Sequence, residues 1–188
     1  MSINHSSGLF SIFCLVIATT VGFSTEVKAD TVKLMSKAAC SPISVAQGDV
    51  GHSAIAFYDN SGKLVATKAM WPGGVQTNNR TDIEMASGQG CGLKTRTAYV
   101  TPARRAWIQN QVASPNGTNC QSYFAVGKVA GSDKFCSCVN FATRVWRQTT
   151  ADQERWQFQS TPKLLGDTIW LQNGWRTNGI FDNGRTWN

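Results

Sequence analysis

The chain has 188 residues, with 18 Lys or Arg against 11 Asp or Glu and a formal net charge of +7. Hydrophobic residues make up 41% and charged residues 15%, a balance that excludes an intrinsically disordered chain. No glycine or heptad period is present, which excludes collagen and coiled coils. The length suits one domain, and the six Cys, seven Trp and 17 Gly favour a loop-rich fold.

The N-terminus has the pattern of a signal peptide. Residues 9–23 carry no charge, but about 15 apolar residues are too few for a membrane span, which needs roughly 20. Val27 and Ala29 then supply the small residues that signal peptidase recognises. We therefore predict cleavage after Ala29, with residues 30–188 exported as a single domain. The alternative is an uncleaved membrane anchor.

The first half of the exported chain predicts one hairpin and one helix. Residues 30–49 form an entry segment without a predicted element, and residues 50–69 read as a β-hairpin around turn formers at 59–62. Residues 71–74 end the second strand, and the polar residues 77–92 read as a loop. Thr101 as N-cap and Pro102 in the first turn then predict a helix that ends near Val112.

The second half predicts two further helices. Residues 114–117 read as a turn and residues 122–129 as a strand. Ser137 caps a helix from Cys138 to about Gln148, whose apolar residues recur at helical spacing. Thr161 and Pro162 start a third helix that ends near Leu171, and the tail from 173 has no clear period. The predicted fold class is α+β, with a small antiparallel sheet packed against helices.

The cysteine count singles out one thiol. Without Cys14, which lies in the signal peptide, the exported chain keeps five cysteines, namely Cys40, Cys91, Cys120, Cys136 and Cys138. An oxidising compartment favours pairing, and an odd number leaves at least one thiol free or bonded to another chain. The unpaired thiol is either functional or buried and inert, and the count alone does not separate these.

One imidazole and one thiol form the candidate catalytic pair. His5 lies in the signal peptide, so His52 is the one histidine of the exported chain. Cys138 lies in the first turn of a helix, where free N–H groups and the helix dipole favour a thiolate. A thiolate beside an imidazole makes a nucleophile and its general base, and the same N–H groups can hold an oxyanion. A histidine at a strand start is more often structural, but the two residues together favour catalysis.

Cys138 is preferred to Cys136 as the nucleophile. Phe141 follows Cys138 by one helical turn and is placed to wedge the helix against the sheet. Cys136 precedes the cap and suits a disulfide, so we expect Cys120 to pair with Cys136 and Cys40 with Cys91. Four cysteines allow three connectivities, and the other two stay open.

The order of these residues resembles a known family. A strand His followed by a Cys on a helix start in a C-x-x-F setting resembles the circularly permuted papain-like (NlpC-like) thiol hydrolases, which include the lecithin retinol acyltransferase-like proteins. Four blocks, at residues 50–55, 70–72, 138–142 and 161–167, resemble permuted domains of bacterial secreted effectors and toxins. The resemblance covers roughly residues 50–174. It implies a small antiparallel sheet with the Cys helix against it, and hydrolysis or transfer at an amide or ester carbon through a thioester. For a toxin it also implies a cognate inhibitor or immunity protein.

The sequence departs from this family at two points. Ser137 precedes the Cys where Asn or Asp is common, and no residue is clearly placed to orient the imidazole. Thr67 is expected on the His52 face of the hairpin, and Asp82 and Glu84 lie in a loop that could reach the site. The orienting role stays unassigned.

The leading hypothesis is an exported cysteine amidase or peptidase that cuts peptidoglycan peptide bonds. A lipid or acyl-ester hydrolase or acyltransferase of the same fold is the first alternative, and a non-catalytic secreted binding module is the second. The basic charge favours an anionic partner such as a cell-wall polymer, a lipid headgroup or nucleic acid. Nucleic acid is not the expected substrate, because a single His and no carboxylate pair make a poor nuclease site, so we expect an anionic cell-wall polymer or a lipid. No cofactor or metal is expected, because a single His and disulfide-prone Cys make poor ligands. The tryptophans are expected in packing rather than as a sugar platform, except Trp175 and Trp187 in the polar tail.

Overall fold

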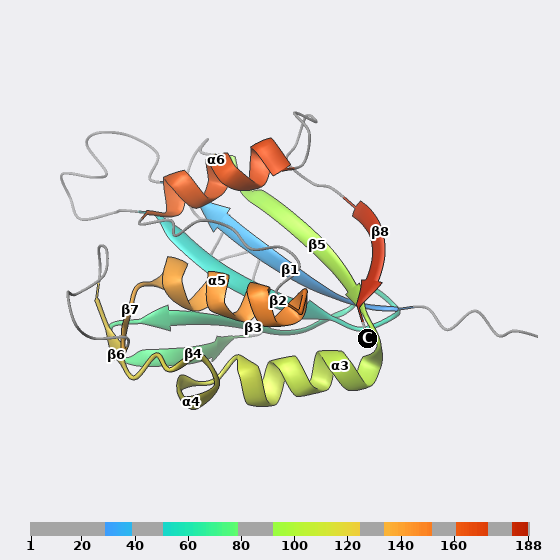
Figure 1. Cartoon of the computed structure of the whole chain (residues 1–188), viewed down its shortest axis with the longest axis horizontal. Helices are drawn as coiled ribbons and strands as arrows, with labels where there is room; N and C mark the ends of the chain where they lie inside the picture. Colours follow the sequence, from blue (N-terminus) through green and yellow to red (C-terminus); the bar gives the residue numbers. More distant parts are fainter. Residues whose placement is uncertain are drawn as a thin grey trace, which may run out of the picture.

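A computed structural model describes residues 29–38, 51–78, 92–124, 134–151 and 161–172 in full, and the backbone of residues 182–187 (Figure 1). One sheet contains six strands, which are β1 (Asp30–Lys37), β2 (His52–Tyr58), β3 (Leu64–Trp71), β4 (Gly74–Asn78), β5 (Lys94–Val100) and β8 (Asp182–Trp187). A second sheet pairs β6 (Ser122–Tyr123) with β7 (Phe135–Cys136). The helices are α3 (Pro102–Trp107), η1 (Ile108–Val112), α4 (Pro115–Thr118), α5 (Cys138–Thr149) and α6 (Pro162–Gln172).

The large sheet has the strand order β4-β3-β2-β1-β5-β8. The first five strands pair antiparallel, and β8 joins β5 in parallel. The predicted α+β class is therefore confirmed. Strand β1 was not predicted: residues 30–37, part of the predicted entry segment, form the strand that β2 and β5 both flank. Strands β4, β5 and β8 were not predicted either.

The predicted hairpin of residues 50–69 is confirmed as β2 and β3. Its turn is held by Asp59, whose Oδ1 accepts hydrogen bonds from the backbone N–H groups of Ser61 (2.9 Å) and Lys63 (3.0 Å). Gly62 in the same turn has φ 81°, a left-handed value that favours glycine. Strand β3 ends at Trp71, as predicted, and a tight turn leads into β4.

The three predicted helix starts are confirmed. The Thr101 Oγ1 accepts from the Arg104 N–H (3.3 Å) at the start of α3, and α6 begins at Pro162. Ser137 caps α5 through a reciprocal pair in which its hydroxyl accepts from the Asn140 N–H and its own N–H donates to the Asn140 side chain. The turn predicted at 114–117 is instead largely the four-residue helix α4. Of the strand predicted at 122–129, residues 122–124 are described, and Ser122–Tyr123 form β6.

Two clusters of buried residues lie on the two faces of the sheet. The main core includes Ile55 and Phe57 of β2, Phe141 and Trp146 of α5, and Ile169 of α6. Helix α5 crosses β1, β2 and β3 on this face, with α6 beside it (Figure 1). A smaller cluster on the other face consists of Met35, Ala54, Ala56 and Ala69. Strand alternation assigns each β2 side chain to one cluster or the other.

Among the helices of the described residues, none combines the length and the hydropathy that a membrane span requires.

Candidate functional site

Cys138 is the first residue of α5, as predicted, and its thiol is free. Its side chain is buried, with 4% of its surface exposed. Cys120 and Cys136 form a disulfide, which confirms that expected pair. Cys14, Cys40 and Cys91 lie outside the described residues. Among the described cysteines, Cys138 is therefore the one that remains available for chemistry.

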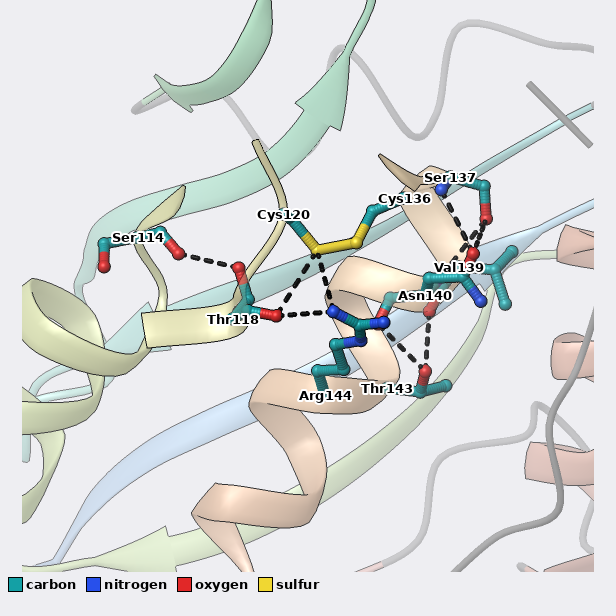
Figure 2. Close-up of a disulfide and its surroundings, with 9 residues drawn as sticks. All are labelled: Ser114, Thr118, Cys120, Cys136, Ser137, Val139, Asn140, Thr143 and Arg144. Carbon is teal, nitrogen blue, oxygen red and sulfur yellow. Dashed lines mark hydrogen bonds between the residues drawn. A yellow bond between two sulfur atoms is a disulfide. The ribbon is translucent and has the colours of Figure 1, made fainter. Parts of the chain in front are cut away.

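The disulfide anchors the chain directly before the α5 start (Figure 2). Cys136 lies two residues before Cys138, and its partner Cys120 follows the short helix α4. Arg144 of α5 donates from Nη1 to the Thr118 carbonyl (2.7 Å) and to the Cys120 sulfur (3.9 Å), as Figure 2 shows. These contacts fix the position of the first turn of α5 and hence of the thiol.

Two opposing effects act on the Cys138 thiol. Burial raises its pKa, whereas backbone N–H groups of Ser53, Val139 and Cys138 itself lower the pKa by stabilising the thiolate. The net direction is upward, because removal from water disfavours the charged form more than three N–H groups favour it. The expectation of a lowered pKa at this helix start is therefore wrong, although the N–H groups on which it rested are present.

His52 is the first residue of β2, and its imidazole stacks on the Trp71 ring. The ring centroids lie 4.1 Å apart with an interplanar angle of 29°. Burial lowers the pKa of His52 from its ordinary value of 6.5 to about 4. The buried Nε2 has no hydrogen-bond partner in the described part of the chain. The imidazole is therefore neutral near pH 7, the form that can accept a proton.

The structure brings His52 and Cys138 to the same end of β2 but not to the same face of the sheet. Ser53, the residue after His52, has its N–H at the Cys138 sulfur. Cys138 belongs to the main core, whereas Trp71 packs on the smaller cluster of the opposite face. Since successive strand residues alternate, the His52 ring lies with Trp71, and no hydrogen bond links it to Cys138 within the described residues.

Two features near the thiol were not predicted. Tyr123 of β6 packs against the main core, and burial together with the charge of Cys138 raises the pKa of its phenol. Ser53 and Ser36 share a buried hydrogen bond (2.7 Å), and Ser36 donates on to the Pro162 carbonyl at the α6 start (2.7 Å). This chain of hydroxyl groups ties the strand beside Cys138 to α6. No sequence signal marked it, because its members are scattered along the chain.

The imidazole-orienting residue stays unassigned. Thr67 pairs with Ala56, which places it on the His52 face as expected. Asp82 and Glu84 lie outside the described residues. Within the described parts, no group of three metal-ligating side chains gathers.

Comparison with known proteins adds no relative. No family model, no curated protein and no solved structure matches this chain.

Proposed function

We propose that the protein is an exported cysteine hydrolase of the permuted papain-like kind, acting on amide bonds of peptidoglycan peptides. The observation that carries the proposal is the Cys138 sulfur at the start of α5, against the N–H groups of Ser53 and Val139. A free thiol kept beside a disulfide, in contact with several backbone N–H groups, has the surroundings of a nucleophile whose reaction forms an oxyanion. The disulfide is compatible with export.

In the proposed reaction the Cys138 sulfur attacks the carbonyl carbon while His52 takes the thiol proton. The oxyanion is held by the N–H groups at the α5 start, and His52 gives its proton to the leaving amine as the C–N bond breaks. Water then hydrolyses the thioester, with His52 again accepting a proton. These steps require the imidazole to turn to the Cys138 face. His52 is the first residue of β2 and follows Gly51, whose φ is 80°, so the proposed turn involves the first residue of the strand and not its middle.

The substrate class follows from charge and from the resemblance. A net charge of +7 favours an anionic polymer such as the bacterial cell wall. An acyl ester would react by the same thioester chemistry, so a lipid or acyl-ester substrate is the alternative that substrate assays must separate.

A non-catalytic binding module is the second candidate function. Three observations favour it, namely the 4% exposure of Cys138, the raised pKa of its thiol, and the position of the His52 ring on the opposite face. In that case Cys138 is a core residue, and its substitution would lower stability without removing an activity.

Digestion of purified sacculi, with identification of the released products, tests the proposal. We expect Cys138→Ala, Cys138→Ser and His52→Ala each to remove nearly all turnover. The Cys138→Ala and His52→Ala double variant should lose little more, because residues that act as a unit are not additive. Thermal melts of each variant serve as the folding control. Full turnover in a folded Cys138→Ala or His52→Ala variant would show that the pair is not the catalytic unit.

Alkylation separates the two candidate functions independently of substrate. Iodoacetamide labelling followed by intact mass measures how fast Cys138 reacts in the folded protein and after denaturation. If the protein is an enzyme, the labelling rate of Cys138 in the folded protein should fall in the His52→Ala variant, since the imidazole promotes thiolate formation. A folded-state thiol that stays unlabelled in wild type and variant alike, with no turnover on any cell-wall or ester substrate, supports the binding module.

A further inference from the structure

A polar groove lies away from Cys138, at the other end of α5. It has a volume of about 670 Å³, within the usual range for small-molecule sites. Its lining comes from α3, η1, α4 and α5 and from the turn between η1 and α4, and it includes Trp107, Asn110, Gln111, Asn116, Gly117 and Gln148. Gln148 and Cys138 are ten residues apart in one helix, a spacing of about 15 Å.

The backbone beneath the groove is held in an unusual form. Helix α3 widens into the π-helix η1, in which the Ala113 N–H donates to the Ile108 carbonyl (2.8 Å). Lys68 of β3 reaches this segment from below, and its Nζ donates to the carbonyls of Gln109 (2.7 Å) and Ala113 (3.0 Å). A π-helix is rare and occurs frequently at functional sites.

Helix α4 packs on η1 without a side chain between them. A Cβ on Gly117 would lie 2.0 Å from the Gln111 carbonyl oxygen and 2.6 Å from that of Val112. Only glycine allows this approach, so η1 and α4 form one fixed surface. Lys68 therefore ties η1 to β3, and Gly117 lets α4 lie directly against η1.

Trp107 is exposed yet held in place. Its side chain is 42% exposed and lines the groove, and the Arg104 guanidinium lies over the indole ring at 4.4 Å. Arg104 in turn donates from Nη2 to the Gln148 carbonyl (2.7 Å), which links the indole to the end of α5. An exposed aromatic ring that is fixed before binding loses little conformational entropy when a ligand stacks on it.

The rest of the lining is amide-rich and uncharged. The side chains of Asn110, Gln111, Asn116 and Gln148 bring four amide groups to the lining, and each amide carries both hydrogen-bond donors and an acceptor. No charged side chain is among the lining residues of the described chain. Val112 is the other apolar residue of the lining, and it is buried.

We propose that this groove binds a neutral saccharide, with a sugar ring stacked on Trp107 and its hydroxyl and N-acetyl groups bonded to the amides. The C–H face of a sugar ring matches a flat indole, and the donors and acceptors of its hydroxyl and N-acetyl groups match those of side-chain amides. A peptide would need apolar pockets for its side chains, and the groove offers none besides the indole. The inference rests on the proposed function, because the ligand would be the glycan strand of peptidoglycan. That strand carries the peptides that Cys138 would cut.

Calorimetric titration of the Cys138→Ala protein with the tetramer of N-acetylglucosamine tests the groove without turnover. We expect saturable binding that Trp107→Ala weakens by roughly tenfold or more. Phe124→Ala is the matched control, since Phe124 is also 42% exposed and lies outside the groove, and it should bind as the parent does. Should Trp107→Ala fail to fold, the Asn110→Ala and Gln148→Ala double variant removes two amides at exposed positions and should also weaken binding.

Absence of saturable binding, or equal binding by the Trp107→Ala protein, would overturn the proposal. A neutral tetrapeptide titrated in parallel is the competing ligand, and binding of the peptide alone would overturn it too. The result is separable from the proposed function, because hydrolysis of glycan-free peptide fragments by the wild type reports on Cys138 alone.

Discussion

His52 should make the stability of this protein depend on pH in the acid range. In the unfolded chain His52 titrates with a pKa near 6.5, and burial in the folded protein lowers this pKa to about 4. Above 6.5 the residue is neutral in both states and stability is complete. As pH falls below 6.5, His52 is protonated in the unfolded chain but stays neutral in the folded protein. Protonation therefore stabilises the unfolded state, and the free energy of unfolding falls.

The size of the effect follows from the two pKa values. Each pH unit between them costs about 1.4 kcal/mol, so His52 removes about 2 kcal/mol of stability by pH 5 and about 3 kcal/mol by pH 4. Carboxylates add their own pH dependence over this range. The His52→Gln variant keeps those carboxylates and loses the imidazole, so the difference between the two proteins isolates the histidine.

Urea unfolding followed by tryptophan fluorescence, at half-unit steps from pH 7 to pH 4, measures this difference. The gap in unfolding free energy between wild type and His52→Gln should shift by about 3 kcal/mol over the range, to the relative disadvantage of the wild type at pH 4. The exported chain has no other histidine if cleavage follows Ala29, so no second imidazole confuses the comparison. Parallel curves would mean that the imidazole is solvated in the folded protein, and the stacked, buried site described here would then be incorrect.

Three further changes test the packing around the groove and the disulfide, each by urea unfolding against the wild type. Gly117→Ala should cost about 1–3 kcal/mol, because its Cβ would meet the Gln111 carbonyl at 2.0 Å, and an unchanged midpoint would contradict that close approach. Lys68→Met should cost about 1–3 kcal/mol by leaving two carbonyls without their donor, and a neutral result would show that water replaces it. The Cys120→Ser and Cys136→Ser double variant should lose about 3 kcal/mol of unfolding free energy, because the disulfide closes a loop with a sequence separation of 16. Reduced wild type is the control and should be as unstable as the double variant.

The sequence predicted the elements that local signals define. Thr101 with Pro102, Ser137 alone, and Thr161 with Pro162 mark helix starts within one or two residues of chain. The turn at Asp59 marks the hairpin in the same way. The central strand β1 escaped prediction, because its partners β2 and β5 come from distant segments and Lys33 and Ser36 interrupt its apolar run.

The site was predicted in its parts and not in its arrangement. The helix start at Cys138 follows from the N-cap residue Ser137. The disulfide of Cys136 follows from the number of cysteines and from its position before that cap. The face of the sheet on which His52 lies depends on the register of β2. A shift of one residue would move the side chain to the other face, so the residues around His52 do not predict its face. The raised pKa of the thiol is likewise a property of the packed core, which spacing along the chain does not reveal.

The central position of β1 sets an order of events for the nascent chain. Residues 30–37 are made early, but their neighbours in the sheet are residues 52–58 and 94–100. Until residue 100 has emerged, at least one edge of β1 has no partner and can pair with other chains. A chain that folds after crossing a membrane would therefore benefit from a holding chaperone until β5 arrives, and truncation before β5 should yield aggregates rather than a smaller folded unit.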